Sequence, residues 1–121
     1  METVSGKRVT RMLSLDLEKE RKANAKITGG VAYKTGDLLT LSEDNTLTHA
    51  TDEKSWHVIN VFDMTAEQST TASANGTEVP IYTGGIFDIE ATSLNGTALT
   101  QAQFSTARAK ATLNKIELQV L

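Results

Sequence analysis

The segment Trp56-His57-Val58-Ile59-Asn60-Val61-Phe62 is the strongest β-strand signal in this chain. β-Branched and aromatic residues dominate it, and these residue types favour strands. Its apolar side chains follow one another almost without interruption, which is typical of a strand covered on both faces. The segment therefore predicts a buried strand around which the rest of the fold is arranged.

Shorter apolar runs separated by turn residues lie on both sides of this segment. They predict further strands over residues 31–33, 38–41, 46–49, 78–82, 86–90 and 116–120. Asn75-Gly76 and Asn95-Gly96 favour tight hairpin turns, in which both central residues need a positive φ. Pro80 places the strand over 78–82 at a sheet edge or at a strand start, because proline lacks an amide hydrogen.

One helix is predicted near the end of the chain. Thr100 and Gln103 have the spacing of a capping box, and Phe104, Ala107 and Ala111 would share one face of the helix. Asn114 would end it. Short strands at regular spacing with a single late helix predict a mainly β fold, a small β-barrel or sandwich with one short C-terminal helix.

The charge distribution divides the chain into an arm, residues 1–28, and a β-rich body, residues 29–121. Seven cations and four anions precede residue 27, whereas five cations and eleven anions follow. The two parts therefore carry about +3 and −6, within a net charge of −3. An extended N-terminal arm that binds a partner, attached to a body that stays in solution, is the expected arrangement.

Leucines alternate with other residues within the arm, at Leu13, Leu15 and Leu17. Alternation favours an extended segment, and we expect it to add a strand to a sheet edge of a partner or a sister subunit. Arg8 and Arg11 would join these leucines in the contact. The alternative is a disordered, charged terminus. Residues 18–26 favour a helix or a solvated coil, and the first 26 residues look poorly suited to a core.

The residues give no support for catalysis, a cofactor or a metal site. The chain has no cysteine, and its two histidines, His49 and His57, fall in predicted strands where a structural role is commonest. Asp88 and Glu90 share one face of a predicted strand, where two solvated carboxylates are the expected arrangement. No phosphate-binding or nucleophile motif occurs. We therefore expect a protein that is not an enzyme.

Nucleic acid and membranes are also unexpected partners. The cations of the arm are interleaved with anions, the arm has no aromatic residue for base stacking, and the pI is about 5.3. No stretch approaches the roughly 20 apolar residues that span a bilayer, and the first residues do not resemble a signal peptide. The expectation is a soluble protein made in the cytoplasm.

Residues 29–42, 45–50 and 78–91 resemble the head decoration, or cement, proteins of tailed bacteriophages. The first of these segments reads Gly-Gly-Val-Ala-Tyr-Lys-Thr-Gly-Asp-Leu-Leu-Thr-Leu-Ser. The resemblance implies a β-rich homo-oligomer, a trimer as first choice and a dimer as second, on the outer capsid surface of the virion. Its partner would be the major capsid protein, with an N-terminal arm supplying contacts.

A decoration protein would stabilise the shell by bridging neighbouring capsid subunits, because it binds only the assembled form. Deletion of residues 1–26 should then leave a folded body that no longer binds capsids. Two other classes stay open. One is an accessory β-domain of a phage tail or baseplate. The other is a small-ligand barrel, which the low aromatic content of 5% disfavours.

Overall fold

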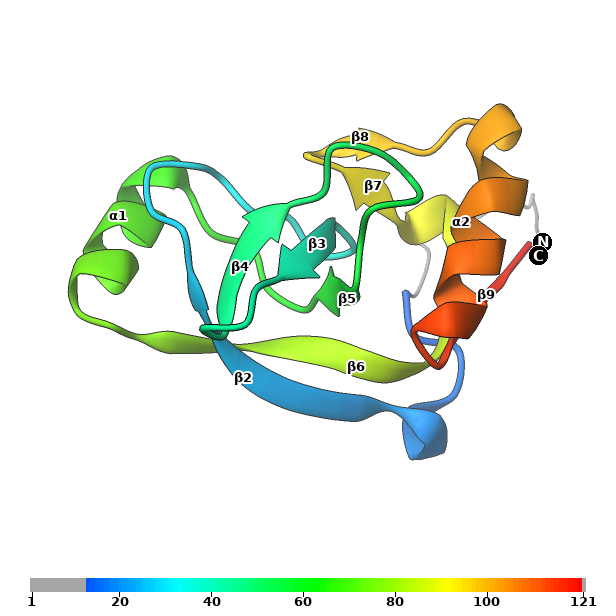
Figure 1. Ribbon diagram of the computed structural model, residues 1–121, viewed down its shortest axis with the longest axis horizontal. Helices are drawn as coiled ribbons and strands as arrows, with labels where there is room; N and C mark the ends of the chain where they lie inside the picture. The colour runs from blue at the N-terminus through cyan, green and yellow to red at the C-terminus, as the bar shows by residue number, and fades with distance from the viewer. Residues whose placement is uncertain (1–12, 121) are drawn as a thin grey trace, which may run out of the picture.

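The computed structural model describes residues 13–120 and shows a mainly β protein (Figure 1). Its main sheet has the strand order β2-β4-β3-β5-β6-β9. These strands are β2 (Arg21–Ile27), β3 (Leu38–Leu41), β4 (Thr46–His49), β5 (Val58–Asn60), β6 (Glu78–Asp88) and β9 (Ile116–Gln119). β2 pairs with β4 on one side and with β6 on the other, so five of the six strands form a closed ring.

The remaining elements connect or extend this ring. They are the short 3₁₀ helices η1 (Leu17–Lys19) and η2 (Ile89–Ala91), the helices α1 (Ala66–Ala74) and α2 (Gln101–Leu113), and the hairpin β7 (Ser93–Leu94) and β8 (Thr97–Ala98). The two helices lie at opposite ends of the molecule (Figure 1). α2 packs beside β9, which extends β6 beyond the ring as a parallel neighbour.

The buried apolar side chains form two clusters on the two sides of the ring. One cluster takes residues from all five ring strands, among them Ala25, Leu39 and Val58. The other lies under α2 and includes Trp56, Phe87, Ala107, Ala111 and Leu118. Burial of one large apolar side chain contributes about 1.5–3 kcal/mol. The clusters therefore hold the ring closed and fix α2 against its outer face.

The segment that includes β5 is buried on both faces, as its apolar sequence predicts. Val58 points into the first cluster and Ile59 into the second. The strand is shorter than expected, because only Val58–Asn60 is paired. Asn60 is buried, and its side-chain amide donates to the carbonyl of Lys34 at 2.9 Å. This bond holds the neighbouring loop where a longer strand would have continued.

The prediction of a hairpin at Asn75-Gly76 is wrong, because this pair ends the helix α1. Thr65 starts the helix: its hydroxyl accepts from the amide of Gln68, whose side chain accepts from the amide of Thr65. Gly76 has φ +65°, which suits the left-handed turn after a helix as well as a hairpin. The expectation of a single helix is therefore wrong too. Asn95-Gly96 does form the tight turn of the β7–β8 hairpin.

β6 is one strand of eleven residues, although the sequence predicts two strands separated at Gly84-Gly85. Pro80 lies inside it, opposite Asn24 of β2. On the β5 side, the pairing covers Tyr82 and Ile81, the latter opposite Asn60, and does not reach Pro80. Proline is tolerated there because one of its sides has no ladder partner.

The prediction of a helix or solvated coil for residues 18–26 is wrong from residue 21 onward, although residues 18 and 19 belong to η1. Arg21–Ile27 form β2, which pairs with both β4 and β6, and Ala25 is fully buried. Ala25 and Ile27 are the buried residues of this strand, while its charged residues are exposed. Deletion of residues 1–26 would remove a ring strand. The expectation that such a truncation leaves a folded body does not agree with this structure.

The helix and strand predicted at the end of the chain are confirmed. The amide of Thr100 donates to the side chain of Gln103 at 2.9 Å, and α2 ends at Asn114. Ala107 and Ala111 are fully buried on the face predicted for them. β9 then follows and pairs with the second half of β6.

Candidate functional site: a basic groove beside the leading segment

The leucines proposed for partner binding begin the described part of the chain. The amide of Leu15 donates to the carbonyl of Ile86 at 2.8 Å, and Leu13 accepts from the amide of Asp88 at 2.9 Å. Residues 13–15 therefore lie along β6 of their own chain. Arg8 and Arg11 lie outside the described residues.

The inward side chain of this segment is Ser14, which the sequence alternation assigns to the opposite face from the leucines. Ser14 is 7% exposed, and its hydroxyl finds no hydrogen-bond partner among residues 13–120. Leu13 and Leu15 are half-buried, and Leu13 packs against the cluster under α2. Leu17 is 70% exposed. Of the three leucines, Leu17 is thus the most accessible to a partner.

A groove of about 890 Å³ lies close to this segment. It opens where β6 changes neighbours: Gly84 is opposite Arg21 of β2, and Gly85 is opposite Ile116 of β9. We call this site the basic groove. Its lining residues are Lys19, Arg21, Thr83, Gly84, Gly85, Ile86, Arg108, Thr112, Lys115, Ile116 and Glu117.

Backbone geometry places the charged groups at this junction. A β-bulge between Arg21 and Lys22 marks the end of regular pairing between β2 and β6, and such bulges redirect side chains. The Arg21 guanidinium donates to the carbonyls of Glu18 and Glu20 at 3.2 and 2.8 Å. A side chain at Gly84 would lie 3.3 Å from Cγ of Arg21, so glycine permits this close approach.

The charge of the basic groove is strongly unbalanced. Its lining holds four cations, Lys19, Arg21, Arg108 and Lys115, and one carboxylate, Glu117, and all five side chains are exposed. The Glu117 carboxylate accepts from the side-chain amide of Gln119 at 2.7 Å. Within residues 13–120, none of the four cations forms an ion pair.

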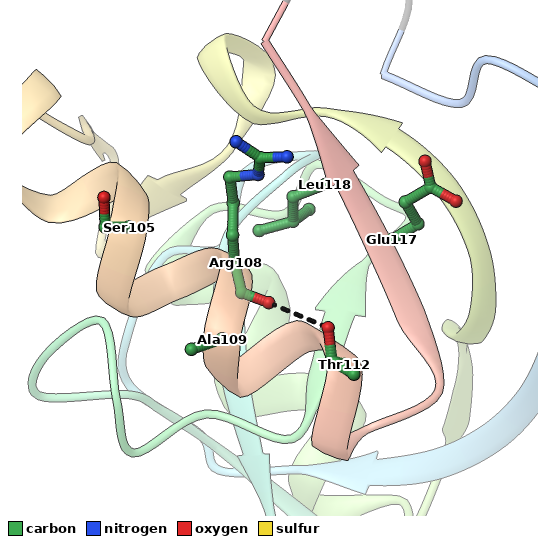
Figure 2. A pocket seen from close by; sticks show the side chains of 6 residues that line it. All are labelled: Ser105, Arg108, Ala109, Thr112, Glu117 and Leu118. Carbon is green, nitrogen blue, oxygen red and sulfur yellow. Dashed lines mark hydrogen bonds between the residues drawn. The ribbon is translucent and has the colours of Figure 1, made fainter.

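A smaller groove of about 350 Å³ continues the site between α2 and β9, and it shares Arg108, Thr112 and Glu117 with the basic groove. Figure 2 shows the Arg108 guanidinium extending from α2 beside Leu118, while the Glu117 carboxylate points away from it. The hydroxyl of Thr112 donates to the Arg108 carbonyl at 3.3 Å, inside the helix (Figure 2). Arg108 thus connects the two grooves.

The sequence did not identify this site, because its cations come from residues 19–21 and 108–115. Lys19 and Arg21 contribute to the positive charge of the front end, but the sequence places them in an arm. Arg108 and Lys115 belong to an otherwise acidic body. Only the pairing of β6 with both β2 and β9 brings the four together.

The two histidines make structural hydrogen bonds, as their positions in the sequence predict. Nδ1 of His57 accepts from the amide of Leu41 at 3.0 Å. Nε2 of His49 donates to the carbonyl of Ala32 at 2.7 Å, and its ring stacks on Tyr33 with centroids 4.8 Å apart. Neither ring lines the basic groove.

Asp88 and Glu90 do not form a pair of solvated carboxylates. Asp88 is fully buried, and its side chain accepts from the amide of Glu90 at 3.0 Å, which starts η2. Glu90 is exposed. The expectation that both are solvated is wrong for Asp88, because the strand ends there and the carboxylate is needed to cap the next turn.

Asp37 is a buried acid that the sequence reasoning did not single out. Its carboxylate is 1% exposed and accepts from the amides of Lys34 and Gly96, both at 2.9 Å, and from the hydroxyl of Ser93. These bonds tie the loop before β3 to the β7–β8 hairpin. Asp37 follows Gly36, and glycine and aspartate are both common in exposed turns, so no local signal marks its burial.

The ionisable groups with shifted pKa values belong to turns and core rather than to the groove. Burial raises the pKa of Tyr33 and, with the nearby Glu20 carboxylate, that of Tyr82. The Ser42 hydroxyl lowers the pKa of Asp44, and the Lys54 amide lowers that of Asp52. Each shift has a structural cause, a buried phenol or a turn that a carboxylate caps.

Within residues 13–120 no group of three or more His, Cys, Asp or Glu side chains is placed to hold a metal ion. No helix in the same part of the chain is long and apolar enough to cross a membrane. In comparisons with known proteins, neither a family model nor a curated sequence matches this chain.

Proposed function

We propose that this protein is a capsid decoration protein. It binds the outer surface of an assembled phage head and stabilises the head by bridging major capsid protein subunits. The resemblance of residues 29–42, 45–50 and 78–91 to such proteins supports the proposal. In the fold these segments include three of the five ring strands, β3, β4 and β6.

One structural observation carries the proposal: residues 13–15, the basic groove and Leu17 lie together around β6. The leading segment is hydrogen-bonded to β6 at Ile86 and Asp88, and the groove opens at Gly84 and Gly85 of the same strand. Leu17 is exposed, and in the sequence it lies between residues 13–15 and the groove residue Lys19. Cations beside an exposed leucine suit a contact with another protein surface. The leucines, with Arg8 and Arg11, remain the proposed partner-binding residues.

We further propose that the ring of strands acts as a small β-barrel and that the protein works as a homotrimer, or a dimer as second choice. A closed ring has fewer free strand edges, which limits unspecific association. Several copies on one shell would each contribute weak contacts, and linked contacts add avidity. The function requires no bond-making step, so the proposed protein is not an enzyme and needs no cofactor.

Cosedimentation with heads tests this function. Purified protein is mixed with expanded heads that lack it, with unexpanded shells and with isolated tails of the same phage. We expect saturable binding to expanded heads alone. Binding to tails and not to heads would instead support the alternative, a tail or baseplate accessory domain. The mass of the free protein in solution gives its oligomeric state.

A further inference from the structure

We propose that the basic groove binds an acidic, extended segment of a partner protein. The identity of that partner, a shell subunit, rests on the proposed function, whereas the groove itself is defined by residues of this chain. Charge, shape and the absence of aromatic side chains each support an acidic polypeptide as the occupant.

The basic groove gathers four exposed cations, Lys19, Arg21, Arg108 and Lys115, on a protein whose net charge is −3. Like charges brought together repel one another, and a bound anion relieves this repulsion. The one carboxylate in the lining, Glu117, already accepts a hydrogen bond from the side-chain amide of Gln119. A partner that supplies carboxylates would therefore complete the ion pairs that are missing among the described residues.

The shape of the site favours an extended chain over a compact ligand. The basic groove and the smaller groove share Arg108, Thr112 and Glu117, so the hollow continues from the β2–β6 junction along α2. Two strongly exposed leucines lie close to lining residues in the sequence. Leu113 follows Thr112 and is 78% exposed, and Leu17 lies two residues before Lys19 and is 70% exposed. A segment with acidic and apolar residues could contact the cations and these leucines together.

Nucleic acid is the competing polyanion, and the lining disfavours it. Single-stranded nucleic acids are held by aromatic side chains that stack on bases, and the basic groove has none. A long phosphate chain would also extend over the rest of the surface, where the acidic residues of the body predominate. A short acidic peptide avoids this repulsion.

A fluorescent polyglutamate peptide is the first probe, with binding followed by anisotropy at low salt. We expect binding that weakens as salt is added, because exposed charges are screened. The double variant Arg21→Glu/Arg108→Glu should bind roughly tenfold more weakly. The control Lys34→Glu/Lys54→Glu changes two exposed cations outside the groove and should bind as the unmodified protein does, apart from a small loss through net charge.

Circular dichroism tests whether both double variants are folded. If Arg21→Glu/Arg108→Glu is not folded, Arg21→Gln/Arg108→Gln replaces it in the binding measurement, because this variant removes the two charges without reversing them. Equal losses in the groove and control variants would overturn the inference, as would the absence of any binding. An oligonucleotide of the same length that binds more tightly than polyglutamate would assign the groove to nucleic acid and overturn it as well.

Binding of the protein and its groove variants to phage heads distinguishes a failure of this inference from a failure of the proposed function. If the protein binds heads and the groove variants bind them equally well, the groove is not the shell contact and the inference is wrong, while the function stands. If the protein binds polyglutamate at the groove but no heads, the function is wrong and the acidic-peptide site stands.

Discussion

Ser14 lies opposite Phe87 in an antiparallel bridge, which holds the first described residues of the chain against the second half of β6. On its other side, this half of β6 pairs with β9. The leading segment is thus attached to the body beside the basic groove. A partner that contacts this segment would contact the groove as well.

The hydroxyl of Ser14 is buried without a partner among the described residues, and this predicts an unusual response to alanine. Ser14→Ala should leave the free energy of unfolding unchanged or raise it by up to about 1 kcal/mol, since an unsatisfied polar atom is removed. Ser69 is the control. Its hydroxyl accepts from the amides of Gly30 and Val31 at 3.0 and 3.2 Å.

Ser69→Ala should therefore cost about 2 kcal/mol, because the amides of Gly30 and Val31 lose their acceptor, which lies on a fully buried residue. Urea denaturation measures both changes. A loss at Ser14 as large as that at Ser69 would contradict the placement of the leading segment.

Asp37 should be among the most sensitive positions in the molecule. Its replacement by alanine leaves the amides of Lys34 and Gly96 without their acceptor in a buried site, so Asp37→Ala should cost about 3 kcal/mol. Asp63 accepts from the Thr35 amide at 2.8 Å on the surface, and Asp63→Ala should cost less than about 1 kcal/mol. Similar thermal unfolding of the two variants would show that Asp37 does not hold the hairpin.

The packing of α2 on the outer face of the ring predicts a contrast between two alanines of one helix. Ala107 is fully buried, and Ala107→Leu should destabilise the protein by about 1–3 kcal/mol through overpacking. Ala102 is exposed in the first turn, and Ala102→Leu should change stability little. If both substitutions are tolerated equally in chemical denaturation, α2 does not pack as described.

The phenol of Tyr33 should make the free energy of unfolding depend on pH at alkaline values. Burial holds its pKa above the ordinary value of 10.0. Above about pH 10 the unfolded chain loses the phenol proton before the folded protein does. The stability that this group contributes is therefore complete below pH 10 and is lost as pH rises through the folded pKa.

The measurement is the free energy of unfolding in urea at a series of pH values from 9 upward. Tyr33→Phe should remove part of the alkaline decline and leave the part that Tyr82 supplies, since burial also raises the pKa of Tyr82. Parallel declines in the unmodified protein and the variant would show that Tyr33 does not titrate differently in the two states.

Local patterns were sufficient for the elements that neighbouring residues determine. The capping box at Thr100 and Gln103, the turn at Asn95-Gly96 and the double-sided burial of β5 all follow from short-range signals. The pair Asn75-Gly76 led to the wrong prediction of a hairpin, because a positive φ at glycine suits the end of a helix and a hairpin equally. Only the Thr65–Gln68 capping box, ten residues earlier, marks the start of α1.

The ring closure and the basic groove could not be predicted from the sequence. Charged and polar residues occupy the outer side of β2, so its apolar content is low. Its place in the sheet depends on pairing with β4, 20 residues away, and with β6, 52 to 63 residues away. The groove arises from that same long-range pairing. Arg21 and Lys115 become neighbours of Gly84 only after β2, β6 and β9 have met.

The central claim is that the protein stabilises an assembled head, and heating tests this most directly. DNA-filled heads that lack the protein are heated with and without a saturating amount of it, and the temperature of genome release is measured. We predict a higher release temperature with the protein, because a ligand that binds only the intact shell stabilises it by mass action. An unchanged release temperature, with the protein demonstrably bound to the heads, would contradict the account.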